Sequence, residues 1–206
     1  KGADFELGRK LGDGKTHAGT HRSSSVALLD ELPKPPHWGA RIVEEMPLEI
    51  VAQHLAINEL YRLSWGAKNT HGDAWEKLKV EFDERLLRMR KAAAKEGWLK
   101  PQGVYGYWPC QAEGNSLILF DPDSIGGDDP RVIEVFDFPR QDSGLGLCLA
   151  DYFAHKELGK FDVVALQVVT VGPEPTERFA AFEAAGEFME GYFLHGLAVQ
   201  MAEATA

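Results

Sequence analysis

Three short runs of β-branched and aromatic residues in the middle of the chain constrain the fold most. Val104–Tyr107, Ser116–Phe120 and Val132–Phe138 each have the length and composition of a strand. Gly114 and Asn115 separate the first two runs, and such a pair is typical of a tight hairpin turn. The pattern therefore predicts that the first two strands pair closely and antiparallel.

A long amphipathic helix is predicted ahead of these strands. Between Asp73 and Lys95, apolar residues recur every three or four positions, opposite a face rich in Lys, Glu and Arg. Asp73 is the expected N-cap of this helix, and Gly97 is its expected stop. The spacing of Leu48, Val51 and Leu55 predicts a shorter helix upstream, and residues 40–43 suit a first strand.

The second half of the chain completes an α+β pattern. Cys148–Phe153 suits a short helix or turn, and Asp162–Thr170 is nearly continuous apolar sequence, which predicts a strand buried on both faces. Residues 176–206 lack proline and predict a long helix, bent at Gly186, Gly191 or Gly196. We expect a twisted, mainly antiparallel sheet with flanking helices and a long C-terminal helix.

Composition excludes several classes of protein. The chain has 206 residues, a net charge of -10 and a pI near 5.2, so a nucleic-acid partner selected by clustered positive charge is not expected. No apolar run is long enough for a membrane span, and no secretory leader is visible, which favours the cytoplasm and no membrane. Cys110 and Cys148 lie in apolar strand-like sequence and are expected to be reduced, buried thiols.

The residues alone predict no complete catalytic or metal site. His17 and His21 have the spacing of two ligands on one helical face, but their Gly- and Ser-rich segment offers no further ligand. Phosphate-binding glycine motifs and a nucleophile elbow are absent from the sequence. We therefore expect neither metal binding nor catalysis by the isolated chain.

Four blocks, in order along the chain, resemble one known family. They are Gly103-Val-Tyr-Gly-Tyr-Trp-Pro-Cys-Gln-Ala-Glu-Gly-Asn115, Phe138-Pro-Arg-Gln141, Leu147-Cys-Leu-Ala-Asp-Tyr-Phe153 and Leu197-Ala-Val-Gln-Met-Ala-Glu-Ala-Thr-Ala206. Their order and spacing are similar to those in the reactivation domain of cobalamin-dependent methionine synthase. Residues 1–30 begin with sequence rich in Gly, Ser and Thr that has no periodicity, which favours a linker or extended arm there. The resemblance implies a reactivation domain over residues 31–206 that is incomplete at its C-terminus, before the family's Gly-Tyr-Pro segment.

The resemblance also implies a function. In this family a methyl group moves from methyltetrahydrofolate to homocysteine through cobalamin, and the reactivation domain binds S-adenosylmethionine and caps the cobalamin domain. It supports reductive methylation of cob(II)alamin with an electron from flavodoxin or an equivalent reductase. Cobalamin would be carried by the neighbouring domain, and zinc would belong only to the homocysteine domain of the parent. The alternative is a non-catalytic docking module for a corrinoid or flavin protein that does not use S-adenosylmethionine.

The resemblance assigns few site residues. Glu203 falls where the family has a glutamate that contacts S-adenosylmethionine, and a carboxylate suits a ligand with an ammonium and a sulfonium group. The family's upstream aspartate has no counterpart, so Asn58 or Glu59 is the expected substitute. Arg140 and Gln141 form a polar pair that is either structural or adjacent to the ligand. No catalytic residue is assigned.

Overall fold

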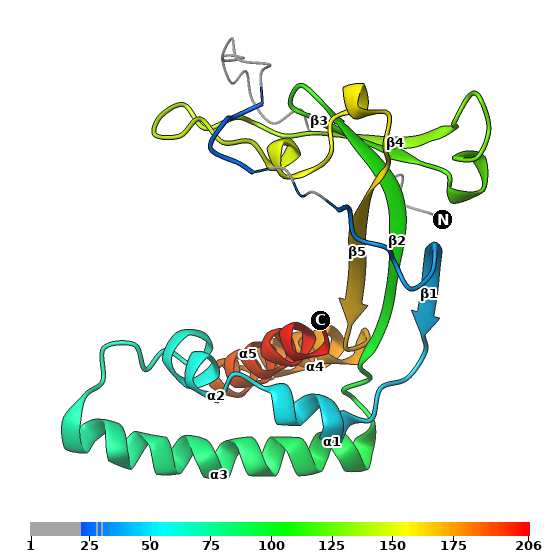
Figure 1. Ribbon diagram of the computed structural model, residues 1–206. Helices are drawn as coiled ribbons and strands as arrows, with labels where there is room; N and C mark the ends of the chain where they lie inside the picture. The colour runs from blue at the N-terminus through cyan, green and yellow to red at the C-terminus, as the bar shows by residue number, and fades with distance from the viewer. Residues whose placement is uncertain (1–21, 28, 30) are drawn as a thin grey trace. The chain divides into compact units, whose positions relative to one another are not determined.

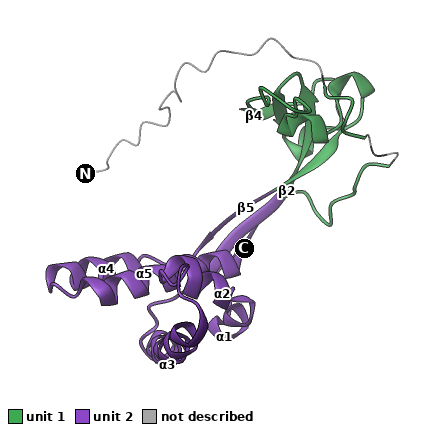
Figure 2. Ribbon diagram, turned by 90° about the vertical axis from the view of Figure 1, so that its left-hand side faces the viewer, with its two compact units in different colours: residues 1–39, 107–165 green, residues 40–106, 166–206 purple. Residues whose placement is uncertain are grey.

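The structure is a computed structural model that describes residues 22–27, 29 and 31–206. The chain forms two compact units, drawn in green and purple in Figure 2. The first comprises the described residues up to Gly39 together with residues 107–165, and the second comprises residues 40–106 and 166–206. The boundary expected between a linker and a single domain near residue 30 stays a prediction.

Antiparallel strands form the first unit, as the sequence predicts. Strands β2 (Gln102–Glu113) and β3 (Ser116–Phe120) are joined by a hairpin in which Glu113 lies opposite Ser116. Gly114 in the turn has a φ of 61°, a conformation that favours glycine. Strand β4 (Val132–Asp137) pairs antiparallel with the other side of β3. The strand order in the whole sheet is β1-β2-β3-β4, and β5 (Asp162–Thr170) also pairs with β2, as Figure 1 shows. Strand β1 (Gly39–Val43) belongs almost entirely to the second unit.

Two small apolar clusters hold this unit together. One is built around Cys110, Leu117, Leu119 and Val164, and the other around Ala112, Cys148 and Ala150. Both cysteines are buried free thiols, which confirms the prediction for them. Burial raises the pKa of the Cys110 thiol well above its ordinary value, with a smaller contribution from nearby Asp162, so this thiol stays protonated. The short helix or turn predicted at 148–153 is confirmed as a 3₁₀ turn over Leu149–Tyr152.

Strand β5 (Asp162–Thr170) corrects one expectation. Its first residues are buried, including Asp162 and Val164, but residues 165–168 are exposed. The prediction that both faces are buried is therefore wrong. An apolar sequence allows a strand to be buried. Each face is buried only if a helix or another part of the chain packs on it.

Helix α3 (Gly72–Glu96) organises the second unit. Its Phe82, Leu86 and Ala93 side chains enter the main apolar core. The helix ends at Gly97, which has a φ of 67° and donates its backbone N–H to Ala93, as predicted. The predicted N-cap is wrong, because His71 occupies that position. Asp73 lies in the first turn, where a carboxylate still interacts favourably with the helix dipole.

The remaining helices pack against this core. Strand β1 (Gly39–Val43) is followed by α1 (Leu48–Val51), which confirms the short helix predicted there. Helix α2 (Ile57–Glu59) follows and runs directly into a π-helical turn over Leu60–Ser64, which the sequence did not predict. This irregular turn supplies two of the most deeply buried side chains of the unit, Leu60 and Tyr61.

The C-terminal helical region contains two helices. Helix α4 (Glu174–Ala184) and helix α5 (Phe188–Thr205) lie against each other, and Gly186 between them has a φ of 77°. The glycine therefore breaks the predicted helix instead of bending it. A long C-terminal helix is confirmed in α5, which has 18 residues.

One indole ring fixes α5 in the second unit. Trp65 is buried with 4% of its surface exposed, and its Nε1 donates a hydrogen bond of 3.0 Å to the backbone oxygen of Phe193. The same ring meets Phe82 and Phe193 edge-on at centroid distances of 5.1 and 5.2 Å. Gly196 lies against the ring, and a Cβ added there would come within 2.9 Å of it. Only a residue without a side chain allows this approach.

Replacing Gly196 with Ala should therefore destabilise the protein although alanine favours helices. We expect the free energy of unfolding to fall by about 1–2 kcal/mol, because the cost of overpacking exceeds the gain in helix propensity. Urea denaturation followed by circular dichroism measures it. Gly126→Ala is the control, since a Cβ there meets nothing within 4 Å. An unchanged or increased stability of Gly196→Ala would contradict the proposed packing.

Candidate ligand-binding site

A pocket in the second unit lies between α5 and the segment that leads into α2. It has a volume of about 300 Å³, at the lower end of the range for small-molecule sites. Its lining combines two carboxylates with small apolar and polar side chains. The lining residues are His54, Ala56, Glu59, Val199, Gln200, Glu203 and Ala204.

Helix geometry explains why α5 contributes these residues. Leu197 and Met201 are fully buried in the core, so the opposite side of α5 must face away from it. Val199 and Glu203 are four residues apart and lie next to each other on that outer face. The hydroxyl of Thr205 donates a 2.7 Å hydrogen bond to the Met201 carbonyl near the helix end. The last turns of α5 thus present one carboxylate at a defined place.

The opposite wall comes from the turn before α2. Leu55 and Leu60 are buried and anchor both ends of this turn in the core. Ala56 and Glu59 between them are exposed and reach the pocket. Gln200 on the α5 side donates a 3.3 Å hydrogen bond to Ser64, just beyond α2. This contact ties the two walls together beside the pocket.

The pocket is suited to a positively charged ligand. Glu59 and Glu203 form no ion pair with any other described residue, and both side chains are exposed at the pocket. Val199, Ala56 and Ala204 add apolar surface beside them. Two unpaired carboxylates next to apolar groups favour a ligand that carries positive charge on an organic skeleton.

The structure brings together only some of the predicted ligand residues. Glu59 and Glu203 share the pocket although they are far apart in the sequence. Asn58 is exposed on α2 but does not line it, and its predicted contact stays a prediction. Sequence reasoning missed His54 and Val199. The position of Val199, one helical turn before Glu203, was a signal that could have identified it.

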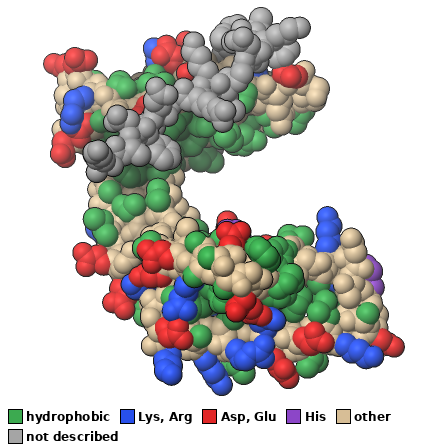
Figure 3. All heavy atoms as spheres, turned by 180° about the vertical axis from the view of Figure 1, so that it is seen from behind, with side chains coloured by type: hydrophobic (Ala, Val, Ile, Leu, Met, Phe, Trp, Pro, Cys, Tyr) green, Lys and Arg blue, Asp and Glu red, His purple; other side chains and the backbone are tan. Residues whose placement is uncertain are grey.

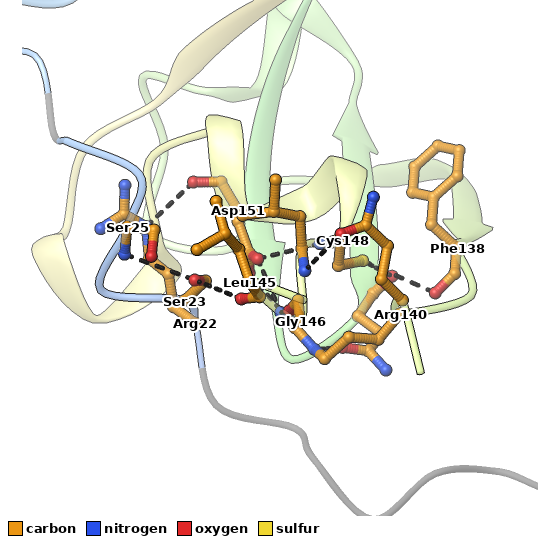
Figure 4. A network of polar contacts seen from close by, with 12 residues as sticks. Arg22, Ser23, Ser25, Phe138, Arg140, Leu145, Gly146, Cys148 and Asp151 are labelled. Carbon is orange, nitrogen blue, oxygen red and sulfur yellow. Dashed lines mark hydrogen bonds and ion pairs between the residues drawn. The ribbon is translucent and has the colours of Figure 1, made fainter. Parts of the chain in front are cut away.

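Arg140 takes a different place, in the first unit. Its guanidinium forms two hydrogen bonds with the Asp151 carboxylate, at 2.6 and 2.8 Å, as Figure 4 shows. Both side chains are buried, with 8% and 0% of their surfaces exposed. The Arg140 guanidinium also donates to Asn115 Oδ1 at 3.0 Å and to the Gly146 carbonyl at 2.7 Å. Arg140 therefore ties the hairpin turn to two loops.

The same network orders neighbouring backbone. One oxygen of Asp151 accepts a 3.0 Å hydrogen bond from the Cys148 N–H, and the Asp151 carbonyl accepts one of 2.9 Å from Arg22. Gln141 closes the loop, since its backbone N–H donates to the Leu147 carbonyl at 2.9 Å. Burial by itself would raise the pKa of Asp151, but the hydrogen bonds from Arg140 and Cys148 hold it below its usual value.

The described residues meet neither the requirements of a metal cluster nor those of a membrane-spanning helix. Among the described residues, no three His, Cys, Asp or Glu side chains are placed to hold a metal ion. His17 and His21 lie outside the described residues. The helices described by the structure include none with the length and apolar character of a membrane span.

Comparison with known proteins then decides the family. Residues 69–206 match the family model described as "Vitamin B12 dependent methionine synthase, activation domain". The chain belongs to this family. It is 34% identical over 196 residues to a methionine synthase of Mycobacterium tuberculosis, and 30% identical over 186 residues to that of Mycobacterium leprae. These matches cover 89% and 85% of the chain but only 16% and 15% of the relatives.

A solved structure shows the same fold as this activation domain. It is described as "Crystal Structure of the MetH Reactivation Domain bound to AdoHcy" and matches with a TM-score of 0.67 at 24% identity. The match covers 82% of this chain and 53% of that one. The predicted fold class, an antiparallel sheet with flanking helices and a C-terminal helix, is confirmed.

Replacing Asp151 with Asn should destabilise the activation domain strongly. The substitution leaves the buried Arg140 without a counter-charge, and we expect a loss of about 3–5 kcal/mol in unfolding free energy at pH 7. Urea denaturation measures it. Asp128→Asn, at an exposed carboxylate, is the matched control. A loss no larger than that of the control would contradict a structural role for the pair.

The effect should depend on pH. Because the pKa of Asp151 is lowered in the folded state, its ionised form contributes stability above the unfolded-state pKa of about 4. This contribution is lost as the pH falls through the folded-state pKa. The stability difference between the native chain and Asp151→Asn should therefore shrink below about pH 4. A difference that grows on acidification would contradict this assignment.

Proposed function

We propose that the pocket between α2 and α5 binds S-adenosylmethionine and that Glu59 and Glu203 hold its positively charged part. One observation carries the proposal, namely that these two carboxylates, predicted separately from the sequence, line the same pocket. A structural neighbour with the same fold is described as bound to AdoHcy, the demethylated form of this ligand, and this description supports the proposal.

The chemistry of the lining fits such a ligand. S-adenosylmethionine carries an ammonium and a sulfonium group, and a carboxylate interacts more strongly with a cation than a neutral acceptor does. The ammonium can donate to Glu59 or Glu203, and the sulfonium is attracted to the same negative charge. Val199 and Ala204 offer apolar contact to the ligand's carbon skeleton. AdoHcy lacks the sulfonium charge, so the pocket should bind it less tightly.

Within a methionine synthase, the pocket would serve to position the methyl donor. We propose that the chain is part of a methionine synthase, caps its cobalamin domain and supports reductive methylation with an electron from flavodoxin or an equivalent reductase. Cobalamin, carried by the neighbouring domain, supplies the methyl-accepting chemistry. The residues of this chain bind and orient the donor, which replaces a bimolecular encounter with a nearly unimolecular one. Two buried free thiols fit a reducing compartment such as the cytoplasm.

Calorimetric titration of S-adenosylmethionine into the 206-residue chain tests this proposal. We expect saturable binding that weakens by about tenfold in Glu203→Gln and in Glu59→Gln, which corresponds to about 1.4 kcal/mol each. Glu183→Gln, at an exposed carboxylate of α4 outside the pocket, is the matched control and should bind like the native chain.

Two results would count against the proposal. Equal affinity of the native chain and both pocket variants for S-adenosylmethionine would mean that the ligand binds at another site. Absence of binding heat, both from this chain and from a version extended beyond Ala206, would favour the docking module that does not use S-adenosylmethionine.

A further inference from the structure

The pocket of Glu59 and Glu203 contains one further group that can carry charge, and neither the fold nor the proposed function uses it. His54 lines the pocket beside the two carboxylates. Its side chain is exposed and forms no ion pair with a described residue. Among the seven residues that line the pocket, it is the only one whose side chain can become a cation.

The backbone on both sides holds this imidazole at a fixed place on the pocket wall. His54 is the last residue of the 3₁₀ turn Ala52–His54, which follows α1. Its neighbours Val51, Ala52 and Leu55 are buried in the main apolar core of the second unit. Because the chain is anchored before and after His54, the exposed imidazole stays at the pocket and away from the core.

The proposed ligand has one group that the two glutamates cannot hold. S-adenosylmethionine carries an ionised amino-acid carboxylate beside its ammonium, and Glu59 and Glu203 repel that carboxylate. The end of α5 at the pocket is a helix C-terminus, whose free carbonyl groups also disfavour an anion. Gln200 has one amide N–H engaged with Ser64. His54 is therefore the strongest partner that the lining offers to a carboxylate.

Lys and Arg side chains do not take this role. They are frequent elsewhere on the second unit, for example along the lower edge of the face in Figure 3. None of them lines the pocket. A charge-assisted hydrogen bond to the ligand's carboxylate can therefore come, among the lining residues, only from a protonated His54.

We propose that His54 recognises the carboxylate of S-adenosylmethionine and makes the pocket specific for a ligand with an intact amino-acid end. The proposal rests on the proposed function, which places this ligand in the pocket. His54 donates to the carboxylate, while Glu59 of α2 and Glu203 of α5 accept from the ammonium. Each charged group of the ligand's amino-acid end is thus held by a partner of opposite sign, and a ligand without the carboxylate leaves the imidazole cation facing only repulsion from the sulfonium.

Calorimetric titration with S-adenosylmethionine and with its decarboxylated form, at about pH 6, tests the proposal. Both ligands carry an ammonium and a sulfonium, and they differ only in the carboxylate. We expect His54→Asn to raise the Kd of S-adenosylmethionine by about tenfold and not to weaken binding of the decarboxylated form. His54→Arg, which keeps a cation, should keep the affinity for S-adenosylmethionine. His71→Asn, at an exposed histidine outside the pocket, is the matched control and should bind both ligands like the native chain.

The dependence on pH gives a second readout, which a merely structural role of His54 would not produce. The ratio of the two Kd values cancels changes that affect both ligands alike, such as a change at Glu59 or Glu203. We expect the preference of the native chain for S-adenosylmethionine to increase as the pH falls from about 7 to about 5.5, since histidine gains its charge in this range. The preference should stay constant over the same range in His54→Asn and in His54→Arg.

Three results would overturn the role of His54. They are an equal loss of affinity for both ligands in His54→Asn, no effect of this variant on either ligand, and a preference for S-adenosylmethionine that falls on acidification. Each of them leaves the proposed function intact as long as Glu59→Gln and Glu203→Gln weaken binding. Absence of binding of both ligands to the native chain would instead overturn the proposed function, and the role of His54 with it.

Discussion

The contact between Trp65 and α5 is the constraint on which the candidate site depends. The indole N–H donates to the Phe193 carbonyl, and the ring occupies the space that the missing side chain of Gly196 leaves. Trp65 follows the π-helical turn that continues α2, so this contact fixes α5 relative to the segment that carries Glu59. The indole ring, together with the surrounding apolar core, thus holds the two elements that carry these carboxylates against each other.

The two units are stabilised by different means. The second has an extended aromatic and aliphatic core, in which α3 packs against α5 and the π-helical turn. The first has smaller apolar clusters and relies in addition on the buried pair of Arg140 and Asp151. Such a pair adds little net stability over a well-packed apolar alternative, but it specifies which loops meet, and removal of one partner is strongly unfavourable.

Local sequence patterns predicted the helices and turns that depend mainly on interactions between neighbouring residues. The α3 helix, its stop at Gly97 and the hairpin at Gly114 follow from periodicity and from the conformational freedom of glycine. Elements that depend on tertiary packing were not predictable in this way. The π-helical turn lies where Tyr61 and Trp65 enter the same core, and the exposure of β5 depends on the layers around it. The resemblance identified Glu203, whereas only the folded chain shows that Glu59, and not Asn58, shares its pocket.

The central claim is that two distant segments form one ligand site on the second unit. Backbone NMR of the isotope-labelled chain during titration with S-adenosylmethionine tests it most directly. We expect amide shifts that saturate together at residues 54–59 and 199–204, while the amides around Arg140 and Asp151 stay unchanged. Shifts confined to the β-strand unit, or to only one of the two segments, would contradict the account.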